Sequence, residues 1–183
     1  RRISTNIETS LHVKWKLIER CIGLVKTFLV DLKHIDPEKF RHYVMGDAAL
    51  VMENLEKLDY FGAHVVIRIP VIPGFNHSMA EIQAMVDFVS TVKGINEIHF
   101  LPFHSFGVEK YRMLGMKYKF NPTGQMEDKE LQPYIQYAES QGFDVIAYSG
   151  NRLVCKILDE NIEKIAEFGE PMPEAIGSLF VIG

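Results

Sequence analysis

The sequence predicts an α/β fold in which parallel strands form part of a (β/α) barrel. Apolar, strand-like segments alternate with amphipathic segments along the chain, which is typical of βαβ units and a parallel sheet. The chain has 183 residues, whereas a complete eight-fold barrel needs about 250. We therefore expect part of a barrel or an open sheet of roughly five strands.

The strands are predicted from apolar runs bounded by turn residues. They cover residues 3–9, 25–32, 64–73, 98–101 and 143–148. The run 25–32 is almost continuously apolar, as expected for a buried strand of a parallel sheet.

The helices are predicted from apolar spacing and from start signals. Asp36 and Pro37 form a cap followed by a first-turn proline, and Ser78 with Glu81 forms a capping box. Pro133 must lie in the first turn of its helix or interrupt it. The predicted helices cover residues 13–22, 48–60, 78–92 and 128–141, with a further helix beginning at 36–37.

Two of these helices have a clear apolar stripe. The stripes predict that Val51, Leu55 and Leu58 face the core from one helix, and that Val13, Leu17, Ile18 and Cys21 do so from the other.

The change of pattern near residue 150 predicts two parts. Residues 1–150 carry the strand and helix alternation, and residues 151–183 form a C-terminal extension of uncertain origin. Pro171 and Pro173 interrupt the helical stripe of this extension.

Composition excludes several classes of function. The net charge of -4 gives no basic footprint for nucleic acid, and no apolar run approaches the roughly 20 residues of a membrane helix. Cys21 and Cys155 are far apart, so neither a disulfide framework nor a clustered metal motif is present. Two reduced cysteines predict a cytoplasmic protein.

Polar side chains lie within or just after three of the predicted strands. Asp31 and Lys33 end the second strand, Arg68 lies within the third, and His104 follows the fourth. In a β/α barrel the carboxyl ends of the strands form the rim where chemistry takes place. Taken singly, each residue has an ordinary explanation: a solvated ion pair, an arginine on an edge strand, or a structural histidine. Glu8 and Thr9 end the first strand and could hold a small cation with oxygen ligands.

Taken together and in this order, these motifs resemble one family. The chain, over about residues 3–150, is similar to the C-terminal portion of a glycyl-radical-enzyme activating enzyme of the pyruvate formate-lyase activating type. This family belongs to the radical S-adenosylmethionine superfamily. The motifs that carry the resemblance are Glu8-Thr9-Ser10, Asp31-Leu32-Lys33-His34 with Asp36-Pro37, Gly46 with Asn54-Leu55, Arg68 with Val71-Ile72-Pro73-Gly74, and Leu101-Pro102-Phe103-His104 with Gly107, Lys110-Tyr111 and Leu114-Gly115.

The resemblance implies a role for each strand end. Asp31, Lys33, Arg68 and His104 match positions near S-adenosylmethionine, and Glu8, Thr9 and Asp31 match a monovalent-cation site. The implied reaction is reductive cleavage of S-adenosylmethionine by a [4Fe-4S] cluster, which installs a glycyl radical on a partner such as pyruvate formate-lyase. A reductant such as flavodoxin or ferredoxin would supply the electron.

The same resemblance predicts that this chain is a fragment. The family holds its cluster with a CxxxCxxC motif, and cluster irons need thiolates, but the sequence has only Cys21 and Cys155. We therefore expect no cluster in this chain and no activity from it alone. The resemblance also implies that the N-terminal strands of the full barrel are missing, which would leave an open sheet edge, a candidate for pairing with another chain or for self-association.

Two other functions remain open at this point. One is a cluster-independent β/α-barrel lyase that resembles an aldolase and uses Lys33 to form a Schiff base. The other is a module that binds a partner protein through its strand-end loops.

Overall fold

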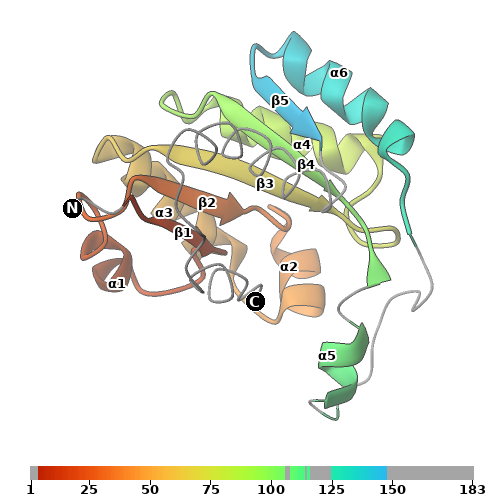
Figure 1. The fold of residues 1–183 in the computed structure, drawn as a ribbon, viewed down its shortest axis with the longest axis horizontal. Coiled ribbons are helices and arrows are strands. Elements are labelled where there is room, and N and C mark those ends of the chain that lie inside the picture. Colours follow the sequence, from red (N-terminus) through yellow and green to blue (C-terminus); the bar gives the residue numbers. More distant parts are fainter. Residues whose placement is uncertain (1–3, 106–107, 114, 116–124, 148–183) are drawn as a thin grey trace, which may run out of the picture. The chain divides into compact units, whose positions relative to one another are not determined.

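A computed structural model of the chain describes residues 4–105, 108–113, 115 and 125–147 (Figure 1). All of these lie in the first of the two compact units into which the chain divides, residues 1–149. The extension predicted at 151–183 lies outside the described residues, as do Gly107 and Leu114 of the fourth strand-end motif.

The described residues contain one sheet of five parallel strands, which confirms the predicted fold class. The strand order is the order of the sequence, β1-β2-β3-β4-β5, so each crossover moves to the next position in the same direction. The strands are β1 (Asn6–Thr9), β2 (Thr27–Asp31), β3 (Val65–Val71), β4 (Glu97–Pro102) and β5 (Asp144–Ala147).

The helices of these crossovers gather on one side of the sheet. Right-handed crossovers that all move in one direction place their helices on the same face, and α3 and α4 lie behind the sheet in Figure 1. The helices are α1 (Trp15–Glu19), α2 (Pro37–Val44), α3 (Ala48–Tyr60), α4 (Met79–Ser90), α5 (Val108–Met113) and α6 (Gln132–Ser140), with a 3-10 turn η2 (Asp128–Leu131) before α6. No helix in the described part of the chain is long and apolar enough to cross a membrane.

The two faces of the sheet differ in chemistry. Successive residues of a strand point to opposite faces. One face carries the core residues Phe28, Val30, Ile67, Ile69, Ile98 and Phe100, each at most 2% exposed. The same alternation and the strand register place Glu8, Asp31, Arg68, Glu97 and His99 on the opposite face, which we call the polar face.

Most helix predictions are confirmed. Asp36 caps α2, where its Oδ1 accepts the Lys39 N–H at 2.8 Å, and Ser78 and Glu81 form the predicted capping box of α4. Pro133 lies in the first turn of α6, after the 3-10 turn. Helix α3 buries the predicted stripe of Val51, Leu55 and Leu58.

The first predicted helix was wrong in length and in its buried face. Helix α1 covers only Trp15–Glu19, and of the predicted stripe Ile18 is buried while Leu17 is 53% exposed. The helix starts late because Leu11, with a left-handed φ of 55°, already enters the core, and Lys14 provides no side-chain cap. A turn over residues 20–24 then ends it, so a single buried residue is all that this short helix supplies.

Candidate binding site at the strand ends

Arg68 is the centre of the polar face. Strand β3 is the middle strand of the sheet, and Arg68 is the register partner of Asp31 on β2. Its Nε and Nη2 lie 2.8 Å and 2.7 Å from Oδ1 of Asp31. Only 13% of its side chain is exposed, so this arginine does not face water from an edge strand.

A second carboxylate reaches the same guanidinium from the next strand. Oε1 of Glu8, on β1, lies 2.9 Å from Nη1 of Arg68. Oε2 of Glu8 accepts a hydrogen bond from Nη2 of Arg68 at 3.1 Å. Burial alone would lower the pKa of Arg68, but Glu8 and Asp31 outweigh it and raise that pKa above its usual value. The guanidinium therefore stays charged, and it faces two carboxylates.

His99 joins this row of polar groups from β4. It is the register partner of Arg68 on the other side, it is 9% exposed, and its Nε2 pairs with Glu97 on the same strand. Sequence reasoning assigned His99 no role. The available signal was its position within an apolar strand, which is the same signal that identified Arg68.

The other predicted site residues lie around this cluster. Lys33 follows β2 by two residues, and His104 follows β4 by two residues, with its backbone bridged to Gln125 and its side chain exposed. Thr9 is the neighbour of Glu8, but its hydroxyl accepts the N–H of Leu11 at 3.0 Å. The structure thus brings Glu8, Asp31 and Arg68 into direct contact and leaves Thr9 in a local turn.

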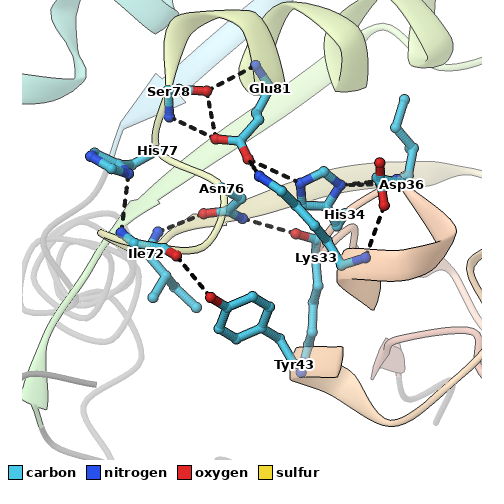
Figure 2. A network of polar contacts seen from close by, with 12 residues as sticks. Lys33, His34, Asp36, Tyr43, Ile72, Asn76, His77, Ser78 and Glu81 are labelled. Atoms are coloured by element: carbon cyan, nitrogen blue, oxygen red, sulfur yellow. Dashed lines mark hydrogen bonds and ion pairs between the residues drawn. The ribbon is translucent and has the colours of Figure 1, made fainter. Parts of the chain in front are cut away.

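Asn76 connects the ends of β2 and β3 and was missed by sequence reasoning. Its Nδ2 donates to the carbonyls of Lys33 at 2.9 Å and Pro70 at 2.8 Å, and its Oδ1 accepts the N–H of Ile72 at 2.7 Å. Figure 2 shows this amide between the two strand ends. No local signal in the sequence distinguishes this asparagine from a turn residue, because its partner Lys33 is 43 positions away.

His34 and Glu81 form a second connection beside Asn76 (Figure 2). Nδ1 of His34 accepts the N–H groups of Ile35 at 3.0 Å and Asp36 at 2.9 Å, so its Nε2 carries the hydrogen that faces Glu81 at 3.4 Å. Burial raises the pKa of Glu81, but hydrogen bonds from Lys39, Ser78 and His34 outweigh it and lower this pKa to about 2.

The described residues contain no group of three or more His, Cys, Asp or Glu side chains that could hold a metal ion. Cys21 lies after α1, and its Sγ donates to the carbonyl of Leu17 at 3.6 Å. The polar face instead brings two carboxylates and a guanidinium from adjacent strands together, and so offers charged hydrogen-bond acceptors and donors.

A sheet of consecutive parallel βα units with charged residues on one face is typical of β/α-barrel proteins. Comparison with known proteins shows which members of this class the chain is related to. The chain is 36% identical over 149 residues to the benzylsuccinate synthase activating enzyme of Thauera aromatica, covering 79% of this chain and 45% of that protein. It is 33% identical over 136 residues to the (2S)-3-sulfopropanediol dehydratase activating enzyme of Klebsiella oxytoca, covering 73% of this chain and 43% of the relative.

A third relative is the pyruvate formate-lyase 2-activating enzyme of Escherichia coli, 32% identical over 143 residues, with 78% and 49% of the two chains covered. The chain is thus a homologue of the glycyl-radical-enzyme activating enzymes, as its motifs predicted. It spans a little less than half the length of the curated relatives it matches. No protein-family model matches it.

Solved structures agree on the fold. A domain of pyruvate-formate lyase-activating enzyme from Bacteroides vulgatus superposes with a TM-score of 0.64 at 18% identity, covering 80% of this chain and 82% of that one. A radical SAM methyltransferase from Sphaerobacter thermophilus superposes with a TM-score of 0.54 at 15% identity, covering 78% of this chain and 39% of that one.

Proposed function

We propose that the intact protein is an activating enzyme of a glycyl-radical enzyme, and that this chain is the part of its barrel that holds S-adenosylmethionine. The observation that carries the proposal is the contact between Arg68 and Asp31 at paired strand positions. It occurs in a chain homologous to activating enzymes, at two motif positions that the resemblance assigned to this ligand.

The chemistry of the polar face suits S-adenosylmethionine. This ligand carries a sulfonium, an ammonium, a carboxylate and ribose hydroxyls. Asp31 accepts hydrogen bonds from ammonium or hydroxyl groups, while Arg68 and Lys33 donate to a carboxylate or a hydroxyl. The excess of one carboxylate in the Arg68 cluster favours a ligand with net positive charge. We assign the exposed ring of His104 a contact with S-adenosylmethionine at the carboxyl ends of the strands.

A monovalent cation at Glu8, Thr9 and Asp31 remains part of the proposal. Carboxylate and hydroxyl oxygens are suitable ligands for a hard cation. Glu8 and Asp31 also hold Arg68, so a bound cation would share these carboxylates with the guanidinium. Binding of K⁺ or Na⁺ that depends on Glu8 would support this part.

The proposed reaction also requires a [4Fe-4S] cluster, which would supply the electron that cleaves S-adenosylmethionine. The sequence contains only two cysteines, and the described residues include no group of three or more His, Cys, Asp or Glu side chains that could hold a metal ion, so we propose that the chain alone holds no cluster and is inactive. The intact protein would then carry three clustered cysteines elsewhere. Its partners would be a glycyl-radical enzyme, such as pyruvate formate-lyase or a relative, and a flavodoxin or ferredoxin in the cytoplasm.

Calorimetry of S-adenosylmethionine binding to this chain tests the proposal. We expect measurable binding that is lost when Arg68→Ala and His104→Ala are combined. Arg41→Ala, which removes an exposed arginine of α2, is the matched control and should leave binding unchanged. A chain that does not bind, or that binds equally well after the double substitution, would contradict the assignment.

A further inference from the structure

The ladder between β2 and β3 stops at a proline. The N–H of Leu32 donates to the carbonyl of Arg68 at 2.9 Å, which is the last bond of this ladder beyond the paired strand residues. In a parallel ladder the next bond would come from the N–H of residue 70. Pro70 has no N–H, so the backbone cannot continue the pairing beside Lys33.

Asn76 supplies donors at that point. Its two amide hydrogens go to Lys33 on the β2 side and to Pro70 on β3, and its oxygen accepts from Ile72. Asn76 is 0% exposed, so its amide has no access to water and depends on these three backbone partners. The side chain thus continues the connection between two strands where the backbone cannot.

The segment after Lys33 is held from the other side by the ring of His34. This ring lies 5.3 Å from the ring of Phe75, between centroids, and contacts Glu81 at the start of α4. Glu81 also pairs with Lys39 of α2. Both loops that leave the strand ends are therefore fixed to each other and to two helix N-termini (Figure 2).

We propose that Asn76 is a positioning residue that holds the carboxyl ends of β2 and β3 in register, so that Asp31, Lys33 and Arg68 form one preformed binding site. Lys33 is held directly through its own carbonyl, and Arg68 lies two residues before Pro70. The coupling of β2 to β3 by Asn76 is inferred from the structure alone. That the site binds S-adenosylmethionine rests on the proposed function.

The first test is amide hydrogen exchange in Asn76→Asp. This substitution keeps the oxygen that accepts from Ile72 but removes both donors to Lys33 and Pro70. We expect the Leu32 amide to exchange at least 10-fold faster relative to the amides of β4, while the Ile72 amide stays protected. Lowering the pH should reduce the effect, because a protonated carboxyl regains one donor.

A variant matched for loss of stability is Val89→Ala. Val89 is fully buried near the C-terminal end of α4, which lies toward the amino ends of the strands and so away from Asn76, because crossover helices run antiparallel to the strands. We expect it to accelerate exchange uniformly. Uniform acceleration in Asn76→Asp would overturn the proposal. If Asn76→Asp does not fold, Asn76→Ser retains one donor and should give a smaller, still local, effect.

Ligand affinity provides the second measurement. We expect S-adenosylmethionine to bind at least 10-fold more weakly to Asn76→Asp, and equally well to Val89→Ala. If exchange in Asn76→Asp accelerates only locally while the affinity for S-adenosylmethionine stays unchanged, the positioning role is overturned. Failure of the unsubstituted chain to bind would refute the proposed function, while the exchange data would still decide whether Asn76 couples the two strands.

Discussion

Arg68 donates its Nε–H to one carboxylate oxygen of Asp31, its register partner on the neighbouring strand, and its Nη2 lies 2.7 Å from the same oxygen. Because the two backbones are paired at this position, the ion pair has a fixed geometry before any ligand arrives. The side chain of Arg68 is mostly buried, and a buried charge depends on its partners.

Asp31→Asn should therefore destabilise the fold by about 1–3 kcal/mol, since the guanidinium would lose its closest ionised partner and keep only Glu8. Chemical denaturation at pH 7 measures this loss. Glu38→Gln removes a carboxylate from the exposed first turn of α2 and serves as the control. Equal stability of both variants would show that Arg68 does not need Asp31.

Glu8→Gln should have a smaller effect on stability, below about 1 kcal/mol, because exposed ion pairs contribute little. Half of the Glu8 side chain is exposed, against 27% for Asp31. The same denaturation experiment, repeated in high salt, should further reduce the effect of Glu8→Gln. A loss as large as that of Asp31→Asn would contradict this ranking.

Glu81 should contribute a pH-dependent part of the stability. Its pKa of about 2 in the folded state lies below the ordinary value of 4.5. A lowered pKa means that the stabilisation is present above about pH 5 and is lost as the pH falls through 4 toward 2. The full contribution is roughly 3 kcal/mol.

The measurement is the free energy of unfolding of the unsubstituted chain and of Glu81→Gln across this pH range. The difference should be largest at neutral pH and should shrink toward pH 2. Other carboxylates contribute equally to both proteins and cancel. A difference that stays constant with pH would indicate that Glu81 is not the titrating group.

Gly46→Ala should be destabilising by about 1–3 kcal/mol through steric overlap. A Cβ at this position would lie 2.9 Å from Nε2 of His12 and 2.9 Å from Cε1 of Phe40. That histidine nitrogen also accepts the N–H of Asp47, so it cannot move without losing a hydrogen bond. A thermal unfolding midpoint equal to that of the unsubstituted chain would contradict this close packing.

The sequence contained enough to predict the sheet and the central charged residues. Arg68 interrupts an apolar strand, and that local conflict between charge and burial is visible without any structure. The helix starts at Asp36 and Ser78 were equally local, because each cap lies within three residues of its partner.

The features that escaped prediction depend on distant partners. Asn76 binds the carbonyl of Lys33 across 43 positions, and His34 meets Glu81 across 47. Helix α1 was overestimated because an apolar stripe was counted without knowing that Leu11 already fills the core ahead of it. Periodicity indicates which segment favours a helix. Tertiary contacts decide how much of that segment becomes helical and which of its residues are buried.

The most direct test of the account is to observe Arg68 while the ligand binds. In a ¹⁵N NMR spectrum of arginine side chains, the Nε–H of Arg68 should be protected by its bond to Asp31. Addition of S-adenosylmethionine should shift this signal, and Asp31→Asn should abolish the response. A spectrum in which S-adenosylmethionine shifts other signals but leaves Arg68 unchanged would show that the ligand binds elsewhere.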